Sequence, residues 1–350
     1  MSPSDSSLSS AAQPGSALDE LSREQRLLAQ VLADVHDGLE RMESVLDEVI
    51  DPPAGYVRAL CQHVRGFGGK RLRPALVVLA GRAVRKGDVG DVHARVGAVV
   101  ELIHTATLVH DDILDGAVIR RSQPTVNALE GVEISVLLGD FLLASAYAEA
   151  ASLEDRLASR YLSRITRVVC QGEMLQIHNR GNLDLSEERY YEIIEKKTAV
   201  LYAAACEVGA RYAGGSEDHV KALHDYGMAL GLGFQIIDDV LDLTGDEAVV
   251  GKSLRTDLSH AKMTLPMIHF LANGPEDERA WVRRTLEDGR GGEEAPRICE
   301  MVQRAGSIAY ARERAEGRVR HGLELLDGLP ESQARTSLEA LANYVLERRL

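Results

Sequence analysis

The chain has 350 residues and carries 40 Lys and Arg against 54 Asp and Glu, which gives a formal net charge of −14. This acidic balance disfavours nucleic acids and anionic membranes as partners, although a local group of cations could still bind an anionic substrate. Apolar residues make up 45% of the chain with one Trp and four Phe, a composition that favours packed helices over sheets.

Cysteine usage and targeting signals indicate the compartment. Cys61, Cys170, Cys206 and Cys299 show neither a short pairing pattern nor metal-ligand spacing, so we expect reduced thiols. The sequence has no uncharged span of about 18 residues and no signal-peptide pattern. We therefore expect a soluble, cytoplasmic protein without a transmembrane segment.

The apolar spacing predicts helices almost throughout. Residues 1–17 are rich in Ser, Ala and Pro and are expected to be a disordered tail. Helices are predicted over 18–50, 57–64, 92–115, 133–151, 155–178, 186–213 and 219–243, with others from about Pro74, from Thr264, near Trp281, and in two or three final segments. No segment of useful length alternates with period two and no linker divides the chain. The prediction is an all-α fold with a single helical domain over residues 18–350.

A glycine-rich basic turn lies at residues 66–74, with the sequence Gly-Phe-Gly-Gly-Lys-Arg-Leu-Arg-Pro. Glycines let the backbone approach a ligand, and the positive end of the helix that follows would face the turn. The alternative is a solvated basic turn with no ligand. The spacing differs from that of a nucleotide phosphate loop, so ATP or GTP binding is not expected.

Two aspartate triplets with the same internal spacing end two apolar helices. The first consists of Asp111, Asp112 and Asp115, and the second consists of Asp238, Asp239 and Asp242. On a helix, the first and last acid of each triplet lie one turn apart, where charges roughly 6 Å apart repel by about 3 kcal/mol at an effective dielectric of about 20. Acids gathered at the ends of buried helices predict a cation between them. Carboxylates shared with substrate phosphates suit Mg²⁺.

Basic residues accompany both triplets and would surround the same cavity mouth if the two helices open there. They are Lys70, Arg73, Arg120, Arg121, Lys197, Lys252 and Lys262. Several metal ions together with several Arg and Lys indicate two highly charged anions, such as diphosphates. The apolar helical segments that precede the triplets predict a deep apolar pocket. A substrate with a diphosphate head and a hydrocarbon tail satisfies both features.

These motifs, in this order, resemble the trans-isoprenyl diphosphate synthases of the polyprenyl type. The resemblance runs from about residue 25 to the C-terminus and is carried by GGKRLRP, HTATLVHDDILD followed four residues later by RR, GDFLLASA, GE-x-x-Q, KT, GFQIIDDVLD, GK and AKMTLP. It implies the isoprenoid-synthase fold around a deep central cavity, usually as a homodimer, with isopentenyl diphosphate and an allylic diphosphate as substrates. A transient membrane contact could accompany product release.

The resemblance also implies a role for each site residue. Asp111 and Asp115 of the first triplet would bind two Mg²⁺ ions, and Asp238 of the second triplet would bind a third. The remaining acids would support these ligands: Asp112, Asp239 and Asp242. Isopentenyl diphosphate would be held by Lys70, Arg73, His104 and Arg121. The allylic diphosphate would be held by Arg120, Lys197, Lys252 and Lys262. Thr198 and Gln235 would stabilise positive charge that develops on the allylic carbon.

Product length follows from helix geometry. One helical turn rises about 5.4 Å, close to the length of one isoprene unit, so residues one turn before Asp111 form the first level of a pocket floor. These are Ala106 and Thr107, both small, whereas short-chain members of the family usually place an aromatic residue there. A deeper floor is then expected at Ile103, Leu138, Phe141, Leu142 or Ser145. The prediction is a product longer than fifteen carbons, of roughly twenty-five to fifty carbons.

Several readings compete with this one. Within the enzymes, the alternatives are a short-chain synthase that makes geranylgeranyl or farnesyl diphosphate, a subunit of a heteromeric synthase, and a terpene cyclase; a second Asp triplet and the GGK turn favour elongation over cyclisation. A catalytically inactive regulatory subunit would not need to keep both triplets and the basic residues. A lipid-binding bundle would not need clustered acids. One departure from the family is Arg255-Thr256-Asp257, where related enzymes commonly carry Gly-Asp-Asp.

Overall fold

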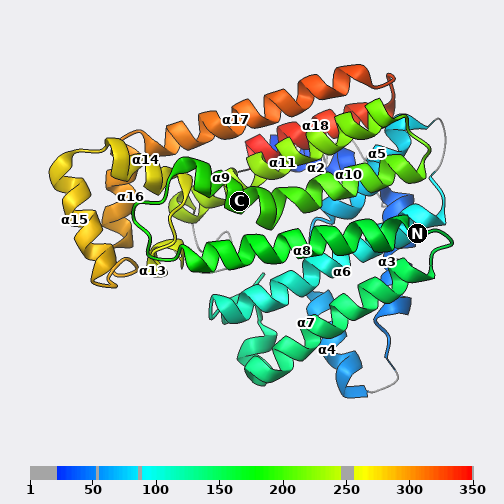
Figure 1. The fold of residues 1–350 in the computed structure, drawn as a ribbon, viewed down its shortest axis with the longest axis horizontal. Coiled ribbons are helices and arrows are strands. Elements are labelled where there is room, and N and C mark those ends of the chain that lie inside the picture. Colours follow the sequence, from blue (N-terminus) through cyan, green and yellow to red (C-terminus); the bar gives the residue numbers. More distant parts are fainter. Residues whose placement is uncertain (1–21, 53–54, 86–88, 246–255, 349–350) are drawn as a thin grey trace, which may run out of the picture.

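Helices build nearly all of the structure, a computed structural model that describes residues 22–52, 55–85, 89–245 and 256–348. Figure 1 shows the longer helices side by side along the long axis of the molecule, with the smaller helices α14 to α16 gathered at one end. The predicted all-α fold is confirmed. The predicted tail at residues 1–17 lies outside the described ranges.

The first half of the chain supplies one wall of the bundle. Its helices are α2 (Arg23–Asp34), α3 (His36–Val49), α4 (Gly55–Gly66), α5 (Leu72–Val84), α6 (Asp91–Leu114), α7 (Val126–Ser152) and α8 (Leu157–His178). The helix predicted over 18–50 is thus divided in two near Val35. Ser22 begins α2 with a capping box, because its hydroxyl accepts from the Gln25 amide while the Gln25 side chain accepts from the Ser22 amide.

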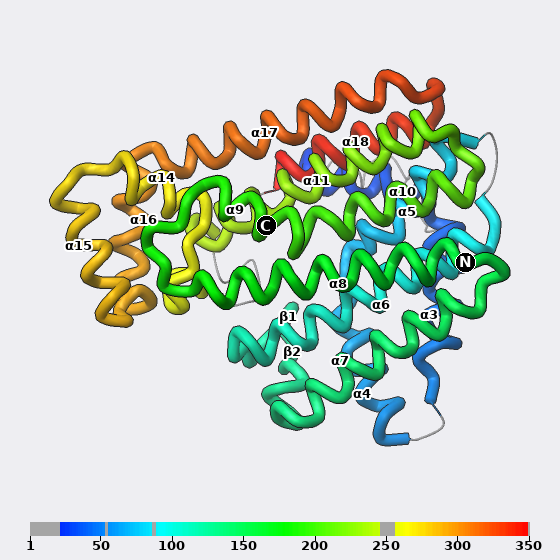
Figure 2. The backbone as a smooth tube through the Cα atoms, in the orientation of Figure 1, coloured from blue at the N-terminus to red at the C-terminus, as the bar shows by residue number. Residues whose placement is uncertain are grey.

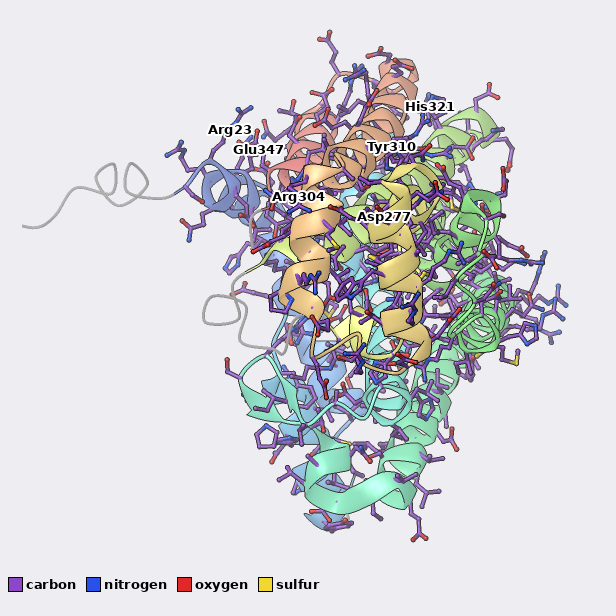
Figure 3. The ribbon with its side chains drawn as sticks, turned by 90° about the vertical axis from the view of Figure 1, so that its left-hand side faces the viewer. Arg23, Asp277, Arg304, Tyr310, His321 and Glu347 are labelled. Carbon is purple, nitrogen blue, oxygen red and sulfur yellow. The ribbon has the colours of Figure 1, made fainter. Side chains whose placement is uncertain are left out.

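The second half continues through the site and ends against the first. Its elements are α9 (Glu187–Ile194), the π-helical turn η1 (Glu195–Ala199), α10 (Val200–Tyr212), α11 (Glu217–Thr244), α13 (Thr256–Ser259), α14 (Leu265–Asn273), α15 (Glu276–Glu287), α16 (Ala295–Arg304), α17 (Ser307–Leu325), the 3₁₀ turn η2 (Leu326–Gly328) and α18 (Gln333–Glu347). The last helix returns to the first, where Arg23 forms an ion pair with Glu347 at 3.1 Å (Figure 3).

Two details between α6 and α7 differ from the sequence-based expectation. A short antiparallel hairpin, β1 (Ile119–Arg120) with β2 (Gln123–Pro124), follows α6 (Figure 2). Helix α7 begins at Val126, earlier than predicted, because the Thr125 hydroxyl caps it by accepting from the Ala128 amide. Its backbone is broken at Gly131, where φ is 82°. The hairpin fixes the backbone positions from which the Arg120 and Arg121 side chains extend.

Helices α6 and α7 are long and apolar enough to cross a membrane by length and composition alone. The share of the most apolar window that is buried inside the protein is 67% for α6 but 28% for α7. Helix α6 is therefore a core helix of the bundle. Helix α7 leaves an apolar face uncovered.

The core consists of two hydrophobic clusters that meet at η1. One lies among α3, α5, α6, α10 and α18 and includes Val200, whereas the other lies among α9, α14 to α17 and the end of α11 and includes Ala199. Two glycines let neighbouring helices approach this turn: a Cβ on Gly172 of α8 would lie 2.4 Å from the Lys197 amide nitrogen, and one on Gly231 of α11 would lie 2.6 Å from the Ala199 Cα. The turn that carries Lys197 and Thr198 is thus clamped between α8 and α11.

Candidate active site

The first aspartate triplet ends α6, and each of its acids has a cation as partner. Asp112 is 2% exposed and accepts hydrogen bonds from Arg120 Nε at 2.9 Å and Nη2 at 2.7 Å. Burial raises the pKa of the Asp112 carboxyl, although the hydrogen bonds and charge of Arg120 oppose the shift. Asp115 lies 2.6 Å from Arg180, which follows the end of α8. The hairpin and the segment after α8 therefore both contact the end of α6.

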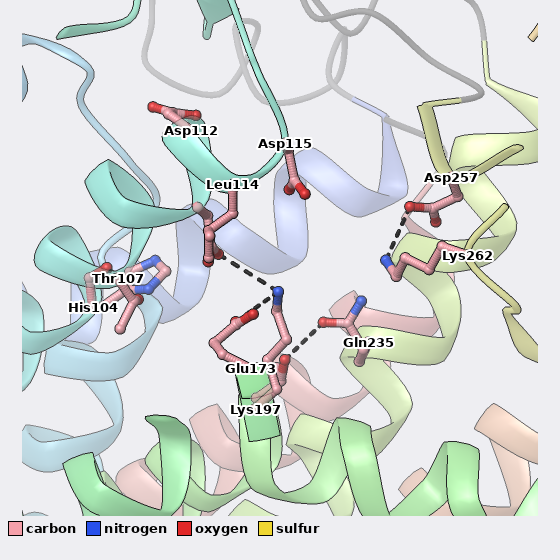
Figure 4. A network of polar contacts seen from close by, with 12 residues as sticks. His104, Thr107, Asp112, Leu114, Asp115, Glu173, Lys197, Gln235, Asp257 and Lys262 are labelled. Carbon is pink, nitrogen blue, oxygen red and sulfur yellow. Dashed lines mark hydrogen bonds and ion pairs between the residues drawn. The ribbon is translucent and has the colours of Figure 1, made fainter. Parts of the chain in front are cut away.

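Asp111 faces the clamped turn. Its Oδ2 lies 3.7 Å from Lys197 Nζ, and its Oδ1 is buried without a hydrogen-bond partner in the described chain. The same ammonium lies 2.6 Å from Glu173 Oε1 of α8. Burial and the neighbouring charge of Asp111 raise the pKa of Glu173 above its ordinary value, and Lys197 only partly opposes them. Lys197 is thus shared by two half-buried acids on different helices (Figure 4).

The second triplet ends α11, and its neighbouring acids point to different partners. Asp238 lies 2.7 Å from Arg348, which follows the last helix. Asp239 is 2% exposed and accepts from Tyr190 at 2.7 Å and from Gln235 at 2.9 Å. Asp242 is 6% exposed and accepts from the Asp257 amide at 3.4 Å. The triplet therefore connects α9, α11, α13 and the C-terminus.

Lys262 lies beside this triplet. Its Nζ is 2.9 Å from Asp257 and 4.0 Å from Asp239. Burial would lower the pKa of Lys262, but the charges of Asp257 and Asp239 outweigh burial and raise it above its ordinary value. In the Arg-Thr-Asp sequence noted above, only the last residue, Asp257, matches the residue that the family commonly carries. Asp257 is also the residue that contacts Lys262. Lys252 and Arg255 lie outside the described residues.

The glycine-rich turn, 66–71, lies close to the hairpin and the C-terminal helix. Arg121 donates to the carbonyl oxygens of Phe67 and Gly68. Lys70 donates to the Tyr344 hydroxyl and lies 3.8 Å from Glu24. Burial lowers the pKa of Lys70, and the charge of Arg348 adds to the shift. Glu24 of α2 therefore partly neutralises Lys70, whereas Tyr344 of α18 only accepts its hydrogen bond.

Arg73 and His104 lie behind that turn. The guanidinium of Arg73 stacks 4.4 Å from the centre of the Tyr202 ring, and its Nε is buried without a hydrogen-bond partner in the described chain. Desolvation, followed by the charges of Arg73 and Arg121, lowers the pKa of His104 well below its ordinary value. His104 is therefore neutral at pH 7 and surrounded by arginines, an environment that suits an anionic ligand.

One cavity is lined by Asp239 of the second triplet and by Lys197 and Arg180, which contact Asp111 and Asp115 of the first triplet. Its lining includes Lys197, Gln235, Asp239, Lys262 and Arg180. In Figure 4, Lys197 and Gln235 point toward the space below Asp115, with Lys262 and Asp257 on its far side. Thr198 donates to Gln235 at 2.8 Å. The catalytic residues expected from the sequence are thus brought together.

The two residues expected to control product length differ in their surroundings. Ala106 is 0% exposed and belongs to the core, whereas Thr107 is half-buried on the adjacent position of α6. The Thr107 hydroxyl donates to the His104 carbonyl at 2.7 Å. Only Thr107 presents part of its surface outside the packed core.

Four side chains of the site were not assigned a role from the sequence. These are Glu173, Arg180, Tyr190 and Arg348. Glu173 had a signal, since it lies in GE-x-x-Q on an otherwise apolar face. Arg180, Tyr190 and Arg348 contact acids that lie far from them in the chain, and no local spacing indicates such contacts.

The donor set suits a hard divalent cation in composition. All candidate ligands are carboxylate oxygens, which Mg²⁺ prefers, and one of them, Asp111 Oδ1, is buried and unpartnered. Within the described residues, no three His, Cys, Asp or Glu side chains form a group that could hold an ion as arranged. The acids instead pair with Lys and Arg of the chain itself, which balance the same negative charge.

The sequence matches known proteins along most of its length. Residues 55–302 match the polyprenyl synthetase family. The octaprenyl diphosphate synthase of Escherichia coli is 36% identical over 301 residues, covering 86% of this chain and 93% of that protein. The short chain isoprenyl diphosphate synthase of Methanothermobacter thermautotrophicus is 38% identical over 330 residues, covering 91% and 99%.

A solved structure extends the likeness to the fold. The polyprenyl synthase of Caulobacter crescentus, described as complexed with calcium and isoprenyl diphosphate, matches with a TM-score of 0.88 and 33% identity, covering 92% of this chain and 98% of that one. The family match spans more than half of the chain, and the relatives are matched over nearly their whole lengths. The chain belongs to the polyprenyl synthetase family and is a prenyl-transferring enzyme.

Proposed function

We propose that this enzyme condenses isopentenyl diphosphate with an allylic diphosphate to make a trans-polyprenyl diphosphate of medium to long chain. The observation that carries the proposal is that two lysines of one cavity each contact a different aspartate triplet: Lys197 contacts Asp111, and Lys262 contacts Asp239. Anionic and cationic side chains alternate there, as a site for metal-bound diphosphates requires. The octaprenyl relative supports a product of this class.

Mg²⁺ is the proposed cofactor, with three ions per site, and would polarise the departing diphosphate. Asp111, Asp115 and Asp238 would be the principal ligands, because each carboxylate is engaged by one ion-pair contact that a metal ion could replace. Asp112 and Asp239 each accept at least two hydrogen bonds and would support the ligands. Asp242 would do the same through the Asp257 amide.

The cations would then exchange partners on substrate binding. Arg120, Lys197 and Lys262, which now pair with acids, would turn to the allylic diphosphate, and Lys252 would join them. Isopentenyl diphosphate would be bound by Lys70, Arg73, His104 and Arg121. Its charge would compensate the mutual repulsion that these basic groups experience in the empty chain.

The reaction breaks the allylic C–O bond, and the electron pair leaves with the diphosphate. Thr198 and Gln235 would face the resulting allylic cation with their oxygen atoms, which stabilise positive charge. The π electrons of isopentenyl diphosphate form the new C–C bond, and loss of a proton restores a double bond. The released diphosphate is the proposed proton acceptor, so no side-chain base is assigned.

Thr107 is the proposed gate on product length. Its side chain lies one turn before Asp111 and is only half-buried, so the growing tail would pass this level. Deeper on α7, Phe141 and Ser145 are also half-buried and would form the next level. Ala106 would act indirectly, because its small side chain lets α6 pack in the core.

A homodimer is the proposed assembly, and α7 is its proposed contact surface. This helix exposes large apolar side chains to solvent: Leu129 by 54%, Val132 by 54%, Val136 by 40% and Leu137 by 62%. A contiguous apolar face of this kind is typical of a protein–protein contact. Cytoplasmic residence is proposed on the same grounds as above, with a transient membrane contact during product release.

The test incubates purified protein with Mg²⁺, radiolabelled isopentenyl diphosphate and allylic primers of ten, fifteen and twenty carbons, and then sizes the products. Mg²⁺-dependent products of roughly twenty-five carbons or more are expected. A short-chain synthase is the second candidate, because a relative with that name is 38% identical. Products that stop at fifteen or twenty carbons would select it. No elongation with any primer would contradict both candidates.

A further inference from the structure

A line of hydrogen bonds crosses the site from Tyr190 to Thr198. The Tyr190 hydroxyl donates to Asp239 Oδ2 at 2.7 Å, and Gln235 Nε2 donates to the other oxygen of the same carboxylate at 2.9 Å. Thr198 Oγ1 donates to Gln235 Oε1 at 2.8 Å. Three elements are joined in this way: α9 supplies Tyr190, η1 supplies Thr198, and α11 supplies the other two.

The direction of each bond is fixed by what its members can donate. An ionised carboxylate accepts only, so Asp239 must receive the N–H of Gln235 rather than its oxygen. The Gln235 oxygen is then directed at Thr198, and the Thr198 proton is used on that oxygen. The lone pairs of Thr198 Oγ1 therefore remain available to a group in the cavity, whereas its proton does not. A reversed amide would instead present N–H groups, which repel a developing cation.

Tyr190 is the outermost donor of this line. It is 3% exposed, lines the same cavity as Gln235 and Asp239, and belongs to the apolar cluster that includes Ile193 and Ile194. Burial and the charge of Asp239 raise the pKa of its phenol well above 10, so the hydroxyl stays a donor at every working pH. No diphosphate-binding or metal-binding role is open to a neutral phenol already bonded to Asp239.

We propose that Tyr190 is a positioning residue for the ionisation step, because its hydroxyl fixes the Asp239 carboxylate and thereby the direction of the Gln235 amide. This inference rests on the proposed function, since it requires that Gln235 and Thr198 face the reacting allylic carbon. Tyr190 acts only through Asp239 and Gln235. Its loss therefore slows the chemical step and leaves substrate binding intact.

The variant that tests this is Tyr190→Phe, which removes one oxygen and keeps the ring. A matched control exists on α11: Tyr226 is also fully buried, and its hydroxyl donates to the Leu338 carbonyl at 2.7 Å, outside the site. Each variant loses one buried hydrogen bond, so both lower Tm by similar amounts. The free energy of a hydrogen bond to a charged group is large enough to change a rate by roughly 10- to 100-fold.

In Tyr190→Phe, kcat for the first condensation falls by about 10-fold or more while KM for both substrates stays within about twofold. Calorimetric binding of a non-reactive thio-analogue of the allylic diphosphate is unchanged. Tyr226→Phe keeps kcat within about twofold. The double variant Tyr190→Phe/Gln235→Ala is no slower than Gln235→Ala alone, because the first change acts through the second residue.

Two results overturn the inference. One is a Tyr190→Phe enzyme with wild-type kcat, and the other is a double variant whose losses multiply. Both are read in an enzyme whose wild-type form elongates primers, so they leave the proposed function standing. A wild-type protein that elongates no primer overturns the proposed function, and this inference with it.

Discussion

The Nη1 atom of Arg348 lies 2.7 Å from Oδ1 of Asp238, so the C-terminal end of the chain neutralises the first acid of the second triplet. Arg348 also lies over the Phe234 ring, 4.2 Å from its centre, and its side chain is 13% exposed. Asp238 lies in α11, and Arg348 is the residue that follows α18. A cation from the chain thus pairs with the carboxylate that we propose as a ligand of a divalent ion.

This contact predicts that Arg348 competes with Mg²⁺. Replacing Arg348 by Gln should tighten Mg²⁺ binding about fivefold, because an ion pair of about 1 kcal/mol no longer has to be broken. Isothermal titration calorimetry of the substrate-free protein measures the effect. Arg335→Gln is the control, since Arg335 pairs with Asp327 and Glu339 away from the site. Unchanged or weaker Mg²⁺ affinity in Arg348→Gln would refute the competition.

The clamped turn predicts a difference between two Gly→Ala changes. Gly172→Ala would push a methyl group against the Lys197 backbone and should lower both Tm and kcat. Gly317→Ala lies in helix α17 with nothing within 4 Å of the new methyl group, and should stabilise the protein by up to about 1 kcal/mol. Thermal unfolding and initial rates report on both. Normal kcat in Gly172→Ala would mean that the turn tolerates displacement.

Product length should respond to Thr107. Thr107→Phe should shorten the product by one or more isoprene units, because an aromatic ring would close the first level of the pocket. Thr107→Ser is the control: it keeps a small hydroxyl side chain at the same position and should keep the wild-type product length. Ala106→Phe should instead cost about 1–3 kcal/mol of stability, since Ala106 is fully buried. If Thr107→Phe and the wild type make products of the same length, Thr107 does not control product length.

Stability should depend on pH through His104. Its pKa in the folded protein is lowered well below 6.5, so the unfolded chain binds a proton in a pH range where the folded chain does not. The contribution of His104 to stability is therefore constant above about pH 6.5 and falls as pH drops below it. His104→Gln should flatten this slope between pH 5 and 7 in thermal unfolding. His36→Gln, at an exposed position, should keep it. An equal slope in both variants would contradict the assignment to His104.

The sequence was sufficient for the helices because apolar spacing and caps are local properties. It missed the start of α7, where the Thr125 cap precedes a break at Gly131, so the apolar pattern resumes later than the helix begins. It also missed the hairpin, because two-residue strands are too short to show a period. The helix predicted over 186–213 is in fact interrupted by the π-helical turn η1, which carries Lys197 and Thr198. The other helices that carry the site were predicted.

The site was predictable where chemistry is written into short motifs, and unpredictable where it depends on contacts between distant segments. Asp238 and Asp239 are neighbours in sequence, yet about 100° of helical rotation separates them and gives them different partners. One faces Arg348 and the other faces Tyr190. No spacing in the sequence distinguishes such a pair. The partners of the two acids become visible only in three dimensions.

The most direct test of the central claim measures Mg²⁺-dependent elongation by Asp111→Asn and Asp238→Asn beside Asp277→Asn. Asp277 is exposed on α15 (Figure 3) and does not line the cavity. Each triplet variant should lose about 100-fold or more in kcat/KM, because Asn removes a charge that the metal-bound diphosphate requires. Asp277→Asn should match wild type, and chelation of Mg²⁺ should abolish all activity. Elongation by either triplet variant at the wild-type rate would contradict the account.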